Sequence, residues 1–213
     1  MNTKKIIMFV ALFVTLSFGA VTASNASFVS DSSLGILSEI GKRINQSNAA
    51  SEKTAFTVNN RGFTLKSFET FEIFLHAKDG KKPTEDEVID FIVEKTVLSQ
   101  EAEKRGLKPT KEETIKLMKG IKEQVDLYAS ENEKDRELLQ ALGADKDEYW
   151  KNEDVIEIYQ DVFAIANLRL ELQKEFEHTK GNGMLQIQDI DDFNNHFENF
   201  TNSLKEKAEV ERK

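Results

Sequence analysis

Histidine is the first residue type to consider for chemistry, because imidazole binds metal ions and moves protons near neutral pH. The chain has three histidines, and they lie far apart in the sequence at His76, His178 and His196. None of them stands in an H-E-x-x-H or comparable metal-binding spacing. We interpret all three as solvated surface residues, and we expect the protein to bind no metal and no cofactor.

The other residue types that carry catalysis or phosphate binding lack the spacing that their chemistry needs. The chain has no cysteine, no serine in a G-x-S-x-G turn and no glycine-rich phosphate loop. Neighbouring carboxylates occur at residues 85–87, 112–113 and 191–192. In a chain with 31% charged residues, such pairs are expected on solvated faces and at helix starts. An enzyme is therefore the least favoured class of function.

One segment, residues 178–189, partly matches a calcium-binding EF-hand loop. Asn182 and Gly183 stand at the fifth and sixth positions of such a loop. His178 and Lys180 occupy the first and third positions, where a calcium ion needs oxygen ligands that include carboxylates. We therefore interpret this segment as a break between helices.

Residues 1–26 have the pattern of a secretory signal peptide. Two lysines precede an apolar run at residues 6–16, which is too short to span a bilayer comfortably, and small residues follow it. Cleavage after Ala23 or after Ala26 fits the small residues that signal peptidase prefers. The alternative is an uncleaved N-terminal anchor. We expect cleavage, and hence a secreted or extracytoplasmic bacterial protein without a stable membrane anchor.

The charge of the chain argues against two kinds of partner. The net charge is −9 at neutral pH, and cleavage of the signal peptide would remove two lysines and make it more negative. Nucleic acid and anionic lipid both need positive protein surface, so we expect neither as a partner. A positively charged client would be favoured. Because the chain has no cysteine, packing without disulfides must stabilise it.

The pattern of apolar residues predicts a mainly α domain over residues 55–213, after a linker at residues 27–54 that is rich in Ser and Asn. Residues 56–58 and 63–65 are expected to form a small β-hairpin, joined by a turn that contains Asn and Gly. Apolar residues then recur every three or four positions, which is the spacing of one helix face. This spacing predicts helices over residues 66–77, 85–105, 111–129, 138–142, 147–176 and about 187–210.

Two of these helices differ in their apolar surface. The helix over residues 85–105 is apolar around much of its circumference, so we expect it to be central. The helix over residues 111–129 carries a single apolar stripe that includes Ile115 and Met118, which is typical of a surface helix.

Local signals predict where these two helices end and begin. Gly106 can take the left-handed conformation that closes a helix, and Pro109 prevents the helix from resuming. Thr110 and Glu113 then match the T-x-x-E capping box at the start of the next helix. Thr84, with Glu87 three residues later, has the same spacing at the start of the central helix.

The helix expected at about 187–210 has the most regular apolar spacing in the chain. Phe193, Phe197, Phe200 and Leu204 follow one another at three and four residues. This face either packs on the core of the same molecule or binds a partner or a second copy. We expect internal packing, because an exposed stripe of three Phe residues would promote aggregation.

Three segments carry patterns that are informative as an ordered set. They are VNNRGFTLKSFE at residues 58–69, VLSQEAEKRGLKPTKEE at residues 97–113 and LLQALGADKDEYW at residues 138–150. In this order and spacing they resemble the N-terminal chaperone domain of SurA-type and PrsA-type foldases. The resemblance covers about residues 56–176, and it implies a SurA N-like helical fold with a small strand pair, completed by a C-terminal helix.

The resemblance also has implications for activity. Only about a dozen residues separate Phe176 from the last predicted helix, so a parvulin-type prolyl isomerase domain does not fit between them. The resemblance therefore implies that the protein holds unfolded or exported polypeptides without isomerising them.

Our leading hypothesis is a secreted, non-enzymatic, chaperone-like protein that binds such polypeptides through an apolar groove between helices. The candidate peptide-binding residues are aromatic side chains on otherwise charged helices: Phe68, Phe71, Phe74, Tyr128, Trp150 and Tyr159. Each of them could instead be ordinary core. The alternative function is a structural or protein-interaction module that uses the C-terminal Phe residues to bind a partner or a second copy.

Overall fold

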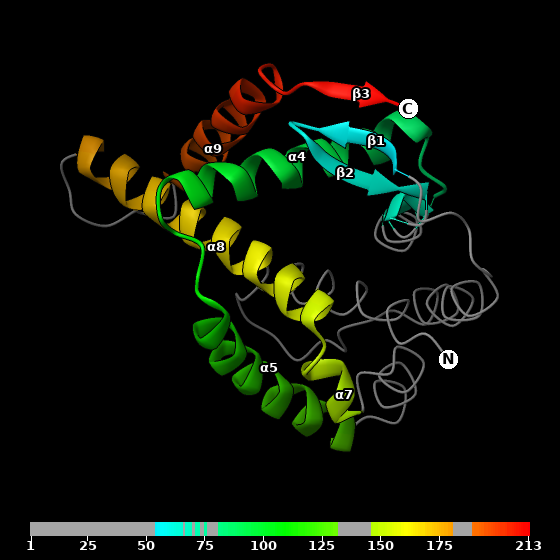
Figure 1. The fold of residues 1–213 in the computed structure, drawn as a ribbon. Coiled ribbons are helices and arrows are strands. Elements are labelled where there is room, and N and C mark those ends of the chain that lie inside the picture. The colour runs from blue at the N-terminus through cyan, green and yellow to red at the C-terminus, as the bar shows by residue number, and fades with distance from the viewer. Residues whose placement is uncertain are drawn as a thin grey trace.

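The computed structural model describes residues 54–65, 67–69, 71–72, 75, 81–131, 146–180 and 189–213. The predicted signal peptide, most of the predicted linker and the short helix over 138–142 lie outside these residues. The described part of the chain is mainly helical with a small three-stranded antiparallel sheet, which confirms the predicted fold class (Figure 1).

The predicted hairpin consists of β1 (Thr54–Val58) and β2 (Arg61–Thr64), which pair antiparallel. Asn59 and Asn60 form the turn between them with φ angles of 47° and 68°. Asn adopts this left-handed conformation more readily than most residues, which explains a two-residue turn at this position.

A third strand, β3 (Val210–Arg212), pairs antiparallel with β1 and gives the strand order β2-β1-β3. This strand was not predicted from the sequence. It has only three residues, Val210 is the single apolar one among them, and so short a segment cannot show the alternation of apolar and polar residues that identifies a half-buried strand.

Two of the predicted helices are confirmed as α4 (Glu85–Lys104) and α5 (Lys111–Glu131). At the start of α4, the amide of Glu87 donates to the hydroxyl of Thr84, and the amide of Thr84 donates to the carboxylate of Glu87. Thr110 and Glu113 make the same reciprocal pair at the start of α5. Gly106 has a φ of 70° and terminates α4 as predicted. We refer to residues 105–110 as the Gly106 turn.

The prediction of one continuous helix over residues 147–176 is wrong. The chain forms the short helix α7 (Asp147–Trp150), then a break at Lys151 and Asn152, and then α8 (Glu153–Lys180). The carbonyl of Asn152 accepts the first helical hydrogen bond of α8, from the amide of Ile156 at 3.0 Å. Asn is a favoured residue at the N-cap of a helix, and this signal was masked by the apolar spacing that continues across the break.

The helices pack around α8. Figure 1 shows α8 running between α4 on one side and α5 on the other, and α9 (Ile190–Lys205) lies against α4 and α8. Phe193 of α9 is only 4% exposed, so the C-terminal helix packs back on the core as predicted. α9 is shorter than the predicted helix over about 187–210, because the chain leaves the helix to form β3.

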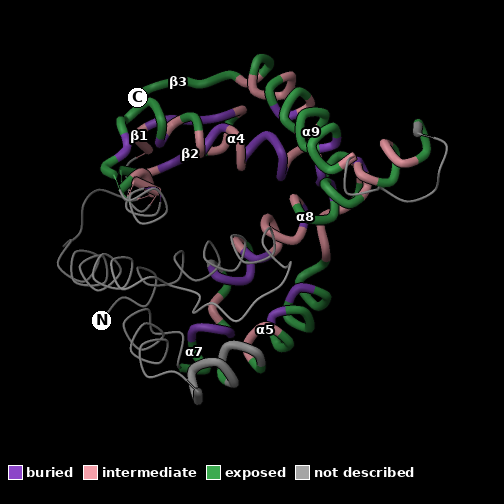
Figure 2. Tube along the Cα trace, turned by 180° about the vertical axis from the view of Figure 1, so that it is seen from behind, coloured by how far each residue is buried: buried purple, intermediate pink, exposed green. Residues whose placement is uncertain are grey.

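Figure 2 shows that buried residues concentrate in β1, β2, α4, α7 and α8, whereas β3 is exposed along its length.

The apolar face of α5 also differs from the prediction. Met118 is buried as expected, but Ile115 is 44% exposed and the neighbouring Thr114 is fully buried. The hydroxyl of Thr114 donates to the carbonyl of Thr110 at 2.8 Å, so its burial leaves no unpaired donor. The buried face is therefore rotated by one residue at the start of the helix.

Candidate functional site

The structure places the six candidate peptide-binding residues in two groups. Phe68 and Phe71 are half-buried beside the sheet and α4, whereas Trp150 and Tyr159 are buried at α7 and α8. Phe74 and the side chain of Tyr128 lie outside the described residues. Phe68 and Phe71 pack against the hydrophobic cluster that contains Trp150 and Tyr159, so the four described candidates share one core but differ in burial.

Trp150 and Tyr159 belong to the core between α7 and α8. Their ring centroids are 6.1 Å apart, and the ring centroids of Tyr149 and Trp150 are 5.1 Å apart. Tyr159 has no exposed surface, and burial raises the pKa of its hydroxyl. In this arrangement both side chains stabilise the fold and have little surface to offer a ligand.

Phe68 and Phe71 lie where the hairpin meets α4. The Phe68 ring packs edge-on against Phe56 of β1, with 6.5 Å between centroids. Phe71 packs in the same way against Phe91 of α4, with 5.7 Å between centroids. Phe91 is also half-buried, so this corner keeps part of its aromatic surface accessible.

A hollow of about 180 Å³ adjoins this corner. Its apolar lining comes from Leu75, Pro83 and Phe91, and its charged lining from Lys81, Glu87, Asp90 and Glu94. The hydrogen bond from the backbone of Thr84 is the main reason that the pKa of Glu87 is lowered, so this carboxylate is ionised at neutral pH. We call this feature the α4 hollow.

Lysines neutralise part of the charge of the α4 hollow. Lys205 lies 2.6 Å from Asp90, and Lys95 lies 3.1 Å from Glu94. The ammonium group of Lys95 also lies 5.2 Å from the centre of the Phe91 ring, which is a cation–π geometry. Basic side chains of this chain thus already contact carboxylates and the aromatic ring that line the α4 hollow.

Sequence reasoning did not identify the α4 hollow. Glu87, Asp90, Phe91 and Glu94 have the spacing of one helix face, so an aromatic residue among carboxylates could have been recognised from the sequence. The contributions of Leu75 and Pro83 could not be predicted, because neither residue belongs to α4 and their positions beside it depend on the tertiary fold.

A second group of polar residues holds the Gly106 turn against α8. The side-chain amide of Gln160 donates to the carbonyl of Pro109 at 2.9 Å, and that of Asn167 donates to the carbonyl of Leu107 at 3.0 Å. These bonds satisfy backbone acceptors in a segment that has no regular secondary structure of its own. The direction of the chain between α4 and α5 is therefore set by α8.

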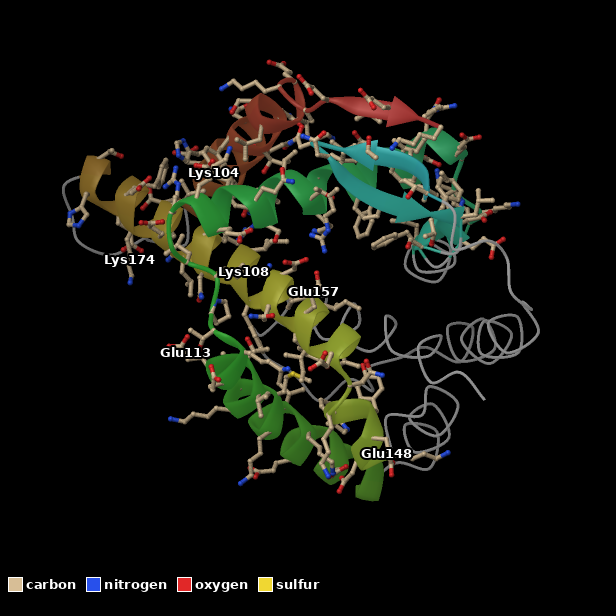
Figure 3. The ribbon with its side chains drawn as sticks, viewed as in Figure 1. Lys104, Lys108, Glu113, Glu148, Glu157 and Lys174 are labelled. Atoms are coloured by element: carbon tan, nitrogen blue, oxygen red, sulfur yellow. The ribbon has the colours of Figure 1, made fainter. Side chains whose placement is uncertain are left out.

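Asp161 of α8 is the centre of a partly buried cluster of charged and polar groups. Its Oδ1 accepts from Ser99 at 2.7 Å and from Lys108 at 2.9 Å, and its Oδ2 lies 2.8 Å from Arg61. Figure 3 labels Lys108 where the Gly106 turn passes α8, and Glu157, which lies 3.8 Å from Arg61. Burial acts to raise the pKa of Asp161, but Arg61, Lys108 and Ser99 outweigh it, and the pKa is lowered. We call Arg61, Ser99, Lys108 and Asp161 the Asp161 cluster.

Two arginines cover the aromatic face of α9. Arg105 lies 5.4 Å from the ring centre of Phe200, and Arg169 lies 4.7 Å from that of Phe197. Arg105 also forms a hydrogen bond with Glu101 at 3.0 Å, which is the main reason that its pKa is raised. The Phe residues of α9 therefore have partners within the molecule.

Metal binding finds no support among the residues that the structure describes. They contain no group of three His, Asp or Glu side chains that could hold an ion. His178 and His196 are exposed, while His76 and most of the EF-hand-like segment lie outside the described ranges. Among the described helices, none is long and apolar enough to span a bilayer.

The chain was also compared with known proteins. No known protein family, no curated protein and no solved structure matches it. Its function has to be inferred from its own residues and geometry.

Proposed function

We propose that this protein is a secreted, non-enzymatic, chaperone-like protein that binds segments of unfolded or exported polypeptides. The α4 hollow is the observation that carries the proposal. It combines apolar surface from Leu75, Pro83 and Phe91 with the carboxylates of Glu87, Asp90 and Glu94. Its volume of about 180 Å³ suits one or two side chains of a polypeptide rather than a whole folded partner.

The charge of the α4 hollow suggests which client segments it favours. A lysine or arginine has an apolar stem and a cationic end, so it can cover an aromatic ring while its charge meets a carboxylate. Lys95 already makes both kinds of contact, with Phe91 and with Glu94. The net charge of −9 would also attract positively charged clients before contact.

The resemblance to SurA-type and PrsA-type chaperone domains supports the same function. The helical fold with a small sheet and a C-terminal helix that returns to the core agrees with what that resemblance implies. α8 ends at Lys180 and α9 begins at Ile190, and the residues between them are too few for a prolyl isomerase domain. We therefore propose that the protein holds clients without isomerising them.

The proposal is tested by suppression of aggregation. The purified protein, without its first 26 residues, should suppress the aggregation of a chemically denatured, cysteine-free client and bind a fluorescent peptide that contains Leu and Lys. The double variant Phe71→Ala, Phe91→Ala should bind this peptide about tenfold more weakly, because it loses two aromatic contacts. Leu117→Ala is the matched control, since Leu117 is 48% exposed on α5.

A charge variant separates loss of binding from loss of folding. Glu94→Gln keeps the size of the side chain but removes one carboxylate of the α4 hollow, so it should weaken binding of the Lys-containing peptide at low salt. Glu123→Gln, at an exposed position on α5, is its control. If the unaltered protein neither suppresses aggregation nor binds the peptide at micromolar concentration, the proposed function is wrong.

The alternative, a module that binds a partner through the Phe residues of α9, has less support. Phe193 is buried, and Phe197, Phe200 and Leu204 are half-buried against α4 and α8. The aromatic face of α9 therefore already packs against α4 and α8 of the same molecule. Self-association stays a prediction.

A further inference from the structure

We propose that the edge of β1 that now pairs with β3 is a binding site for an extended polypeptide segment, and that β3 occupies this site as an internal competitor. This inference rests on the proposed function and names the place where a client strand would bind. An extended segment that adds to a sheet edge gains main-chain hydrogen bonds whatever its sequence, which suits a protein with many clients.

The geometry of β3 is that of a bound peptide. It pairs antiparallel with β1, with Phe56 opposite Arg212, Thr57 opposite Glu211 and Val58 opposite Val210. Two further backbone bonds extend the pairing, from the amide of Asn59 to the carbonyl of Glu209 and from the amide of Lys213 to that of Ala55, each at 2.9 Å. Main-chain pairing thus joins β3 to β1 along its whole length.

The side chains of β3 contribute little to its attachment. All three are exposed, and Val210 keeps 42% of its surface accessible. Arg212 forms ion pairs with Glu85 and Asp86 at 3.2 and 3.4 Å, but all three of these side chains are well exposed. Exposed ion pairs of this kind contribute little to stability, so β3 can be exchanged for another strand at small cost.

The residues of β3 also indicate the chemistry of the client. Directly opposite residues lie on the same face of a sheet, so Val210 and Arg212 share the face of Val58 and Phe56. The position opposite Phe56 lies beside Glu85 and Asp86 at the start of α4, and these carboxylates favour a basic residue there. The site therefore fits an extended segment with an apolar residue followed, two positions later, by Lys or Arg.

A surface hollow of about 540 Å³ lies at the turn end of the same edge. It is lined by Asn59, Gln100, Glu103, Lys104, Lys207 and Glu209. Glu209 immediately precedes β3, and its amide donates to the side-chain oxygen of Asn59 at 2.9 Å. A client strand that takes the place of β3 can therefore continue past Asn59 into polar surroundings.

A reversible disulfide tests the proposal in the intact chain. Val58 and Val210 are directly opposite on neighbouring strands, so the double variant Val58→Cys, Val210→Cys can form a bond that holds β3 in place. The natural chain has no cysteine, so no other disulfide can form within the double variant. With a cysteine-free fluorescent peptide that contains Val-Glu-Arg, the reduced variant should bind about tenfold more tightly than the oxidised variant, because only the reduced form can release its edge.

The cysteine-free natural chain, with and without reductant, is the control for the reductant itself. Equal binding by the oxidised and reduced variants would overturn the competitor role of β3, while aggregation suppression by the same samples would leave the proposed function standing. Absence of both binding and suppression in every form would overturn the proposed function together with this inference.

A second variant keeps the test decisive if the cysteine pair disturbs the fold. A chain that lacks residues 209–213 should bind a synthetic peptide of residues 207–213 added separately, and it should bind the same peptide with Arg212→Glu more weakly. The full chain should bind the natural peptide more weakly than the shortened chain does, because its own β3 competes for the edge. Failure of the shortened but folded chain to prefer the natural peptide would show that the edge of β1 is not a strand-binding site.

Discussion

The ammonium group of Lys108 lies 2.9 Å from Oδ1 of Asp161, and this contact joins the Gly106 turn to the N-terminal third of α8. The other carboxylate oxygen of Asp161 lies 2.8 Å from Arg61 on β2. One carboxylate therefore connects the sheet, the end of α4 and the long helix α8. The relative placement of the sheet and the Gly106 turn depends on it.

Replacement of Asp161 by Asn should destabilise the protein. Asn can still accept from Ser99, but Lys108 would lose its carboxylate partner and Arg61 would keep only Glu157 at 3.8 Å, while both cations remain partly buried. We expect the free energy of unfolding to fall by about 2 kcal/mol, less than for a fully buried pair because both cations keep some exposure to water. Urea denaturation measures the change. Glu153→Gln, which removes an exposed partner of Lys111, is the control and should cause no measurable loss.

The Asp161 cluster should also make the stability depend on pH. Because the pKa of Asp161 is lowered in the folded protein, its contribution is present above the pKa of about 4 for an unfolded carboxylate and is lost as the pH falls through the folded value. The capping carboxylates Glu87 and Glu113 also have lowered pKa values and act in the same direction.

Urea midpoints should therefore change little between about pH 5 and 7 and fall at about pH 4 and below. The Asp161→Asn variant should show a smaller fall over the same range, since Glu87 and Glu113 remain. An identical acid dependence of variant and natural protein would contradict a charged Asp161 in the fold.

Two glycine substitutions should change stability in opposite directions. Gly106 has a φ of 70°, and a Cβ there would meet no atom within 4 Å, so Gly106→Ala should cost about 1 kcal/mol through backbone strain alone. Gly120 is inside α5 with similar free space but no positive φ, and Gly120→Ala should stabilise by about 0.5–1 kcal/mol. Thermal unfolding of both variants measures the difference, and the same sign for both would contradict the assigned conformation of Gly106.

Phe193 and Ile190 provide a test of how α9 packs. Phe193 is 4% exposed, so Phe193→Ala should lower the free energy of unfolding by about 3–4 kcal/mol. Ile190 is 47% exposed one turn earlier, and Ile190→Ala should stay within about 0.5 kcal/mol of the natural chain. Sedimentation should give the same mass for both variants as for the natural protein if α9 serves only the core of one molecule. A change of mass in Phe193→Ala would instead favour a role in association.

The parts of the fold that depend on neighbouring residues could be predicted from the sequence. Thr84 with Glu87, and Thr110 with Glu113, act over three residues, and so both helix starts were identified correctly. The end of α4 at Gly106 could also be predicted, because a residue without a side chain readily adopts the left-handed conformation that closes a helix. The aromatic spacing of α9 also indicated internal packing correctly, since an exposed stripe of Phe residues is unfavourable in water whatever the fold.

The parts that depend on distant residues could not be predicted. Arg61 and Asp161 are surface-type residues in the sequence, and only the fold shows that they meet. The break at Asn152 was missed because the apolar spacing continues across it, although the residue itself is a good helix cap. The spacing of Phe68, Phe71 and Phe74 indicates one helix face, but the sequence does not show which of the candidate aromatic residues the core buries.

The pairing of β1 with β3 has a kinetic consequence. Asn59 and Glu209, which bond directly, are separated by 150 residues, whereas β1 and β2 are joined by a two-residue turn. A hairpin of this kind forms within about 1–10 μs, whereas contacts between residues so far apart in the sequence form more slowly. During refolding the open edge of β1 is therefore exposed before β3 covers it, and two refolding molecules can pair through it. The yield of refolded monomer should accordingly fall as the protein concentration rises.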